Sequence, residues 1–266
     1  MQRSTKRAFV AVVAAILATM PVLAADSPKP RSQVFSGETL RMPRFLKHPL
    51  IFQLSPTDRV TIYRTPQDTC GLYTWGVFTV SNGGGPVPHI HYADKEWFLT
   101  ENQGGIRVFL PKDPLPSLVP GQVPGLNGPS QAMGSTLLPS HAALFSRQGI
   151  VHYYTNESGE RLSGFHNVWA PGYGMIGVFQ VFDQAVKRGQ PLDPQELMAQ
   201  TGLWGTPHDS AGVMVGTSDY RKNPGPGVTA PTNLKQLQAL IDKGESCFTE
   251  RQPEPPGVSV PGPAQP

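Results

Sequence analysis

The sequence predicts an all-β domain followed by a helical C-terminal extension. Between residues 36 and 172, short segments rich in β-branched and aromatic residues alternate with clusters of Gly, Pro, Asn and Asp. This pattern is typical of antiparallel barrels and sandwiches. After Gly172 the apolar residues recur at helical spacing, and helix-capping signals accompany them.

The chain begins with the features of a secretory signal peptide, which we expect to span residues 1–24. Arg3, Lys6 and Arg7 precede an uncharged apolar run, and the tripeptide Val-Leu-Ala then offers a small-residue cleavage site. The run is shorter than the roughly 20 apolar residues that cross a bilayer. We therefore predict an exported protein, periplasmic or extracellular, with no membrane anchor after cleavage. Residues 25–35 are polar and form a predicted N-terminal arm.

Charge gives no indication of a nucleic-acid partner. The whole chain carries 22 Lys and Arg against 19 Asp and Glu, and the signal peptide holds three of the basic residues and no acidic one. Its removal leaves 22 − 3 = 19 basic residues against 19 acidic ones, so the mature protein is formally neutral. No stripe of Lys or Arg that could neutralise phosphates stands out. We expect a small-molecule partner and no nucleic acid, and a homodimer stays open.

The predicted barrel, residues 36–172, contains several segments of strand composition. They are VTIYRT (60–65), GLYTWGVFTV (71–80), GIRVFL (105–110), AALFSR (142–147), VHYYTN (151–156) and RLSGFHNVWAP (161–171). The connection 111–138 carries repeated Pro and Gly that forbid regular structure. We expect this loop to be either disordered or functional, for example as a lid.

The extension, residues 173–250, carries three helix signals. The first helix has an apolar face and ends at Gly189, and the second begins at an Asp-Pro pair at residue 193. The third runs from Asn233 to Lys243 with its leucines on one face. We expect these helices to serve packing and not to build a site. The Pro-rich tail 251–266 is predicted to be disordered.

The two cysteines, Cys70 and Cys247, would enter an oxidising compartment on export, where a disulfide can persist. The sequence leaves a disulfide and two free thiols equally open, because it does not give the distance between the two Cα atoms. A disulfide would tie the C-terminal segment to the edge of the barrel. Neither cysteine lies in a C-x-x-C motif, so redox catalysis is not indicated.

A group of polar residues predicts a metal site. His89 and His91 are two residues apart, so on a strand both side chains point to the same face and can reach one ion. Glu96 has the wrong parity for that face, but the intervening YADK resembles a turn that would bring it back on the neighbouring strand. Imidazole and carboxylate ligands suit one divalent transition metal ion, such as Fe, Mn, Ni, Co or Cu. Candidates for a fourth ligand are His48, His141, His152, His166 and His208.

Two motifs resemble those of the cupin superfamily. Residues 83–96 read G-(x)5-H-x-H-(x)4-E, and residues 149–156 read G-x-x-H-x-x-x-N. The resemblance covers roughly residues 50–172 and implies a cupin jelly-roll β-barrel. By the same resemblance, the metal ligands are His89, His91, Glu96 and His152. The second motif departs from the family pattern, because Arg147 stands where proline is usual and His141 where glycine is usual.

A narrower resemblance is to the single-cupin branch similar to quercetin 2,3-dioxygenases. It rests on residues 76–101 and on the segment from WAPGYG at residue 169 to TGLWG at residue 205. This resemblance implies a metal-dependent dioxygenase that uses dioxygen on a flavonol-like or other phenolic substrate. The metal would act as a Lewis acid and Glu96 as the catalytic general base. The aromatic residues around Trp97, Phe98 and Tyr154 agree with an aromatic substrate.

Two other functions stay open. An oxalate-degrading, germin-like cupin would use the same four ligands, but a dicarboxylate needs an arginine clamp, for which Arg107 and Arg147 are the candidates. A non-catalytic cupin could bind a small molecule, or bind a partner through the loop 111–138. The fold does not decide between these functions.

Overall fold

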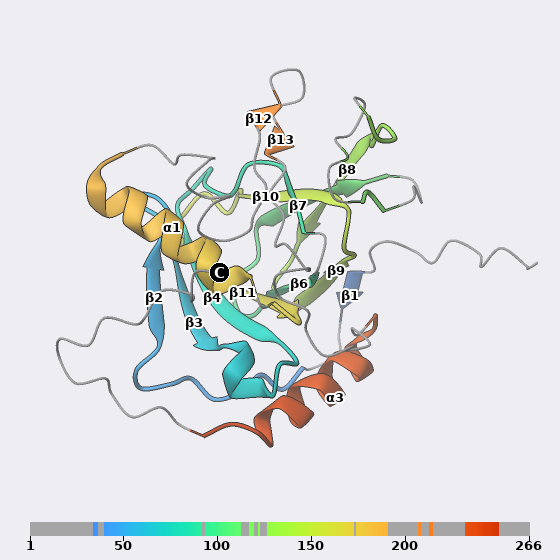
Figure 1. Ribbon diagram of the computed structural model, residues 1–266. Helices are drawn as coiled ribbons and strands as arrows, with labels where there is room; N and C mark the ends of the chain where they lie inside the picture. Colours follow the sequence, from blue (N-terminus) through green and yellow to red (C-terminus); the bar gives the residue numbers. More distant parts are fainter. Residues whose placement is uncertain are drawn as a thin grey trace, which may run out of the picture.

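The computed structural model consists of two antiparallel β-sheets and flanking helices (Figure 1). It describes residues 40–91, 94–112, 117–119, 122, 127–172, 174–190 and 232–249, and the backbone of 34–36, 207–208 and 213–214. The strands are β1 (Val34–Ser36), β2 (Leu50–Gln53), β3 (Arg59–Arg64), β4 (Thr74–Val80), β5 (His89–Ile90), β6 (Lys95–Thr100), β7 (Ile106–Pro111), β8 (Met133–Leu138), β9 (Ala142–Ser146), β10 (Val151–Asn156), β11 (Leu162–Ala170), β12 (Pro207–His208) and β13 (Val213–Met214). The helices are η1 (Pro66–Thr69), α1 (Met175–Arg188) and α3 (Leu234–Glu245).

The strand pairing defines a jelly roll. One sheet has the order β1-β9-β6-β11-β4-β3-β2 and the other β5-β10-β7-β8. From β4 to β11 the pairs are nested: β4 pairs with β11, β5 with β10, β6 with β9 and β7 with β8. A long hairpin rolled across two sheets gives this order, which is the jelly-roll arrangement. The predicted all-β fold with a C-terminal helix is thus confirmed.

The strands expected from composition are all present, and one expectation about a connection is wrong. The connection 111–138 was expected to lack regular structure, but its last part forms β8, which pairs with β7 from Ile106↔Leu138 to Pro111↔Met133. This part of the connection contains no proline, so its backbone can pair with a neighbour. Residues 113–116, 120–121 and 123–126 lie outside the described residues.

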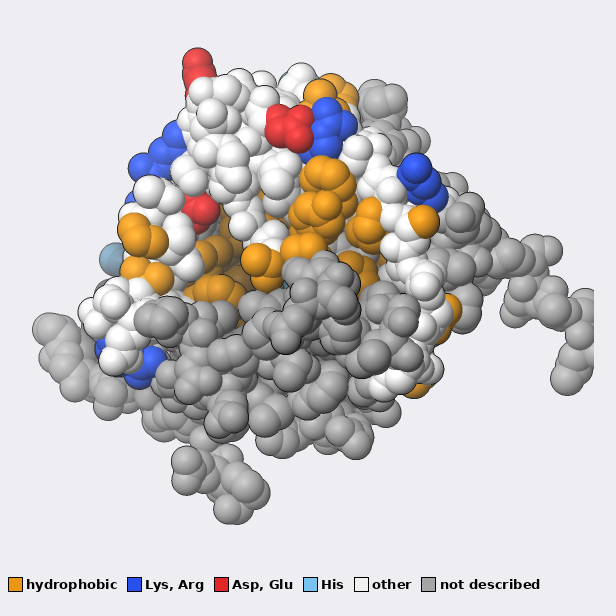
Figure 2. Space-filling model, turned by 90° about the horizontal axis from the view of Figure 1, so that it is seen from above, with side chains coloured by type: hydrophobic (Ala, Val, Ile, Leu, Met, Phe, Trp, Pro, Cys, Tyr) orange, Lys and Arg blue, Asp and Glu red, His pale blue; other side chains and the backbone are white. Residues whose placement is uncertain are grey.

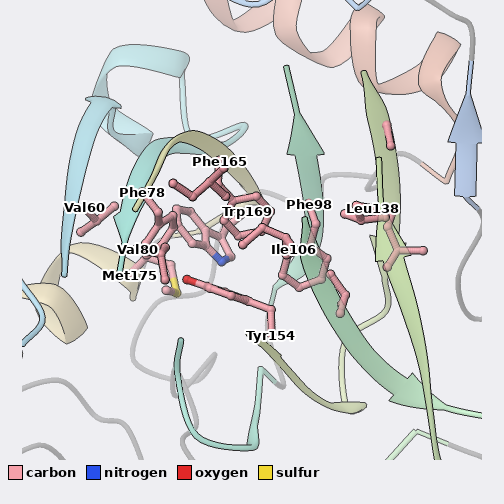
Figure 3. Packing of buried hydrophobic residues seen from close by; sticks show 14 of the residues in the cluster. Val60, Phe78, Val80, Phe98, Ile106, Leu138, Tyr154, Phe165, Trp169 and Met175 are labelled. Atoms are coloured by element: carbon pink, nitrogen blue, oxygen red, sulfur yellow. The ribbon is translucent and has the colours of Figure 1, made fainter. Parts of the chain in front are cut away.

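The interior of the barrel is an apolar core closed by α1. Figure 3 shows this core, in which Phe78, Phe98, Phe165 and Trp169 pack together from strands of the larger sheet. Phe179 of α1 stacks on it, with its ring centroid 5.5 Å from that of Trp169. As predicted, α1 ends at Gly189, whose φ of 64° is a left-handed conformation that glycine adopts without strain.

A second apolar cluster lies on the outer side of the larger sheet, where α3 covers it (Figure 1). Asn233 caps α3 by accepting a hydrogen bond from Gln236 N at 2.9 Å. Leu237 and Ile241 are then buried against Trp75 and its neighbours. Cys70 and Cys247 form a disulfide with Cα atoms 5.8 Å apart, so the open question about the two thiols is answered in favour of the bridge.

Some predicted segments lie outside the described residues. These are the signal peptide 1–24, the start of the second helix at residue 193 and the tail 251–266, so these three stay predictions. Within the part of the chain that the structure describes, none of the helices has the length and apolar character needed to cross a bilayer.

Candidate metal centre

The four residues predicted as metal ligands converge inside the barrel. His89 lies on β5, His91 directly follows it, Glu96 lies on β6 and His152 on β10. Their potential ligand atoms all lie within 4.8 Å of one another. His152 and His89 are direct partners in the β10–β5 pair, which places the two imidazoles side by side with ring centroids 4.4 Å apart. The sequence-based grouping of these four residues therefore agrees with the fold.

The path by which Glu96 reaches the histidines differs from the expected one. We predicted that a turn would return Glu96 on a strand neighbouring that of His89 and His91. Instead β6 belongs to the larger sheet, between β9 and β11, while β5 pairs with β10 in the smaller sheet. The chain crosses from one sheet to the other after His91, so Glu96 faces the histidines across the barrel. Strand parity therefore does not govern its position.

Backbone carbonyls orient two of the imidazoles. Nδ1 of His89 lies 2.8 Å from Val87 O, and Nδ1 of His152 lies 2.8 Å from Ile150 O. A carbonyl oxygen can only accept a hydrogen bond, so each Nδ1 donates a proton to it. In the neutral ring, Nε2 then presents a lone pair to the interior of the barrel. This is the tautomer that a metal ligand requires.

The carboxylate of Glu96 supplies the observation that fits a cation. Its Oε1 accepts a hydrogen bond from Asn167 Nδ2. Its Oε2 lies 2.8 Å from His152 Nε2 and 3.8 Å from His91 Nε2. Among the described residues, neither Oε2 nor His152 Nε2 has a hydrogen-bond partner, although both are buried. Two buried lone pairs face each other here, and a positive ion between them would satisfy both.

The electrostatics of the cluster favour neutral His89 and ionised Glu96. Burial, with the neighbouring imidazoles of His152 and His91, holds the pKa of His89 well below its usual value. Burial opposes ionisation of Glu96, but the rings of His152 and His91 and the Asn167 amide outweigh it and lower the Glu96 pKa. Both residues are thus in the protonation state that binds a metal ion.

His91 differs from His89 because it has an acidic neighbour. Burial opposes its charged form, but Asp94, with a carboxylate oxygen 4.0 Å from His91 Nδ1, and Glu96 raise the His91 pKa above its usual value. Asp94 is itself buried, and its Oδ1 accepts the Gly172 N–H at 2.7 Å. The carboxylate of Asp94 therefore favours the protonated form of this imidazole.

Glycines of the two sequence motifs join the motifs in space. Gly149 N donates to His91 O at 2.7 Å, and Gly83 N donates to Asn156 O at 2.8 Å. Gly149 has a φ of 68°, and a Cβ there would lie 2.6 Å from Leu118 O. Glycine is therefore required at this position, because any side chain would meet backbone.

The two departures from the family pattern have a structural explanation. His141, where glycine is usual, has a φ of 55°, in the left-handed region that glycine adopts most easily. Its side chain is exposed, which leaves room for an imidazole. Arg147, where proline is usual, donates from Nη2 to Ser117 Oγ at 3.1 Å. Both departures lie outside the four-residue cluster.

His89, His91 and Glu96 of the cluster line a cavity of about 390 Å³, together with residues of the apolar core and of α1. Its wall includes Phe78, Tyr154, Trp169, Met175, Phe179 and Phe182. No Lys or Arg is among the described residues that line it. Figure 2, which views the molecule from above relative to Figure 1, shows hydrophobic side chains gathered in the middle of that face. The cavity therefore suits an apolar molecule with a polar group at the metal-ligand cluster.

Two expectations about the surroundings of the site are wrong. Trp97 was expected near the substrate, but it packs in the outer cluster under α3, with its ring 5.1 Å from that of Phe145. The first helix was expected to serve packing only, but Met175, Phe179 and Phe182 of α1 line the cavity. Tyr154 does line the cavity, and Phe98 belongs to the surrounding core.

The other histidines described do not join the cluster. His166 is buried on the outer side of the sheet, where its Nδ1 accepts a hydrogen bond from Trp75 Nε1 at 3.2 Å. His48 and His141 are exposed. The side chain of His208 lies outside the described residues.

Sequence reasoning missed Asn167 and Asp94, which hold Glu96 and His91. A signal existed for Asn167, because it lies two residues before Trp169 and so shares the inward face of β11. Asp94 lies in the YADK segment that was interpreted only as a turn. A buried carboxylate there has no signature in the sequence.

Comparisons with known proteins give weak likenesses. No protein-family model matches the chain, and no curated protein matches it either. Among solved structures, KdgF from Halomonas sp. matches with a TM-score of 0.32 and 13% identity over 48% of this chain and 94% of that one. Oxalate decarboxylase from Lactobacillus farciminis, in a formate complex, matches with a TM-score of 0.31 and 16% identity over 49% of this chain and 30% of that one. An oxalate oxidase in complex with the substrate analogue glycolate matches with a TM-score of 0.31 and 15% identity. The match covers 44% of this chain and 52% of that one.

At such values these likenesses say nothing about the activity of this chain. The jelly roll and the buried group of three histidines and one glutamate come from its own structure. Both are what the resemblance to the cupin superfamily implies. Neither supports the narrower resemblance to quercetin 2,3-dioxygenases over other metal-binding members of that superfamily.

Proposed function

We propose that this protein is an exported, metal-dependent cupin that acts as a dioxygenase on a flavonol-like or other phenolic substrate. One observation carries the proposal: a cluster of three imidazoles and a carboxylate adjoins a cavity whose wall is mostly aromatic and aliphatic. Such a cavity can bind a ring system, and the cluster can bind a hydroxyl group on that ring.

His89, His91, Glu96 and His152 would hold the metal ion. A divalent transition metal supplies a Lewis acid that lowers the pKa of a bound hydroxyl group and positions the substrate. The contribution of the chain is to keep this site in one geometry. Val87 O and Ile150 O fix two imidazoles, and Asn167 fixes the carboxylate.

Glu96 is proposed as the general base. Asn167 occupies its Oε1, while no described residue hydrogen-bonds to its Oε2. This oxygen can therefore accept the proton of a substrate hydroxyl group bound at the cluster. The apolar side chains of Phe78, Trp169 and Phe179 would pack against the activated ring and limit the access of water to it while dioxygen reacts.

An aromatic substrate agrees with the cavity better than a small dicarboxylate does. Oxalate would need a cationic clamp for the carboxylate that is remote from the metal. Of the two candidate arginines, Arg107 pairs with Glu157 at 2.8 Å and Arg147 bonds Ser117, and neither lines the cavity. An oxalate-degrading cupin remains the alternative function for the same four ligands.

The proposal is tested by oxygen uptake with metal-loaded protein and a panel of flavonols, catechols and oxalate. We expect oxygen consumption with phenolic compounds and none with oxalate. Glu96→Gln should abolish turnover, and its metal content must be measured alongside. Full turnover in a Glu96→Gln variant that retains metal would disprove the general-base role. Export is tested separately, by the N-terminus of protein purified from its native compartment.

A further inference from the structure

Beyond the metal cluster, the wall of the cavity contains polar atoms that no described residue satisfies. Trp169 Nε1 and Asn167 Oδ1 are buried and have no hydrogen-bond partner within the described chain. Tyr154, which is 4% exposed, also lines the cavity, and its phenol oxygen forms no hydrogen bond with any described residue. In Figure 3 this oxygen points toward Met175, another residue of the cavity wall.

Unsatisfied polar atoms are costly in a protein core. A buried donor without a partner costs about 1–3 kcal/mol, and most such atoms in native proteins are bonded to protein or to ordered water. On the outer side of the same sheet, the buried indole of Trp75 does have a partner, because its Nε1 donates to His166 Nδ1. The polar atoms of the cavity wall that bond no described residue are therefore free to bond a ligand that enters the cavity.

The available chemistry specifies the ligand atom. An indole N–H can only donate, and a neutral phenol must also place its proton on an acceptor. Both Tyr154 and Trp169 can thus donate to an acceptor on the ligand, such as a carbonyl oxygen. Tyr154 lies two residues beyond His152 on β10, so its Cα lies about 7 Å further along the strand on the same face. The acceptor is then remote from the group at the metal cluster.

We propose that Tyr154 is a specificity-determining residue whose phenol donates a hydrogen bond to an acceptor oxygen on the remote part of the ligand. The ligand class is an apolar ring system with a hydroxyl group for the cluster and a carbonyl-type oxygen at its far end. Trp169 provides a second donor in the same wall. This inference rests on the proposed function only in that the same cavity binds the substrate.

Two probes that differ by one acceptor test the inference: 2-naphthol and 6-acetyl-2-naphthol. Their affinities are measured by titration calorimetry with Zn²⁺-loaded protein in the absence of oxygen, so no turnover is required. The wild-type protein should bind the acetyl compound about three- to tenfold more tightly, which is the range for one neutral hydrogen bond. Tyr154→Phe, which removes only the oxygen, should abolish this difference.

The chain offers a matched control on the same strand. Tyr153 faces the other side of β10, where its ring stacks on Phe109 with centroids 4.2 Å apart. Tyr153→Phe should keep the full difference between the probes. The inference is overturned if neither probe binds, if wild type shows no difference, or if Tyr154→Phe keeps it. It is also overturned if Trp169→Phe removes the difference while Tyr154→Phe does not. None of these outcomes depends on dioxygenase activity, so failure of the proposed reaction would be seen separately.

Discussion

The two sides of the larger sheet differ in how the indole N–H groups of their tryptophans are paired. Strand β11 contributes to both, since Asn167 and Trp169 face the cavity and His166 and Val168 lie on the outer side. On the outer side, His166 accepts from the indole of Trp75. On the inner side, the indole of Trp169 has no partner among the described residues. The same strand thus packs into the outer apolar cluster with one face and lines the cavity with the other.

On the outer side, polar contacts tie α3 to the sheet. Arg64 is fully buried, and its Nε and Nη2 bond the two carboxylate oxygens of Glu245 on α3 at 2.7 Å each. Its guanidinium stacks on Phe248 at 3.9 Å. Tyr73 OH donates to the same carboxylate at 2.9 Å. These contacts, with the disulfide, hold α3 and the segment after it against the outer side of the sheet.

Removal of the disulfide should have the largest effect on stability. The bridge closes a loop of 177 residues, for which loop-closure entropy predicts about 5 kcal/mol in the Cys70→Ser/Cys247→Ser variant. Urea unfolding measures this loss. The metal affinity of the folded variant should be unchanged, because the cluster lies on the opposite side of the sheet. A parallel loss of metal affinity would show that the two sides are not independent.

The next largest loss of stability is expected for Arg64→Met. It should lower the free energy of unfolding by about 3 kcal/mol, because it leaves the Glu245 carboxylate without its main partner. We place the loss at the lower end of the range for buried pairs, since the Glu245 side chain is 27% exposed. The matched control is Arg107→Met, which breaks the ion pair with Glu157. The two side chains of this pair are 31% and 41% exposed, so the loss in unfolding free energy should be less than about 1 kcal/mol. Equal losses in the two variants would contradict this interpretation.

His152→Ala tests the inner side. Loss of a partner that only supports a ligand typically costs 10–100-fold in metal affinity, so loss of a ligand should cost at least about 100-fold. Metal content after dialysis against a chelator measures it. His166→Ala is the control, because this histidine is also buried but lies on the outer side. The control should lose stability and keep its metal, and a similar metal loss in both would refute the assignment.

The contrast between the two sides also shows what the sequence could predict. The resemblance of two motifs to those of the cupin superfamily predicted the four clustered residues, and composition predicted the strands on which His152 and Trp169 lie. The direction of individual side chains was not predictable in β6, where five consecutive residues from Glu96 to Thr100 are buried. A strand buried on both faces loses its alternating pattern, so Trp97 could not be assigned to the outer side.

The sequence likewise did not predict which residues far apart in the chain pair with one another. The pairing of Arg64 with Glu245 spans 181 residues, and no local pattern indicates it. The inward direction of Asn167 could be predicted from its spacing to Trp169, but no sequence feature indicates that Glu96 is its partner. The helix α3 was predictable because its apolar spacing and its Asn233 cap are local.

The smallest effect that we predict is a dependence of metal affinity on pH, and it arises from His91. The pKa of this residue is raised above its usual 6.5 in the metal-free site, so below the raised pKa a metal ion must displace a proton. Affinity should therefore fall about tenfold for each pH unit below that pKa. The metal ion has no second proton to displace from His89 until the pH is well below 6.5, because the pKa of His89 is lowered.

Competition with a chelator between pH 8 and pH 6 measures this dependence. Asp94→Asn removes the acidic group that raises the His91 pKa, so the fall in affinity should begin at a lower pH than in wild type. Glu101→Gln removes instead the carboxylate 3.5 Å from His166, on the outer side, and should leave the profile unchanged. If Glu101→Gln shifted the profile as far as Asp94→Asn does, protonation on the outer side would have to reach the metal cluster. The separation of the sheet into a stabilising side and a binding side would then be wrong.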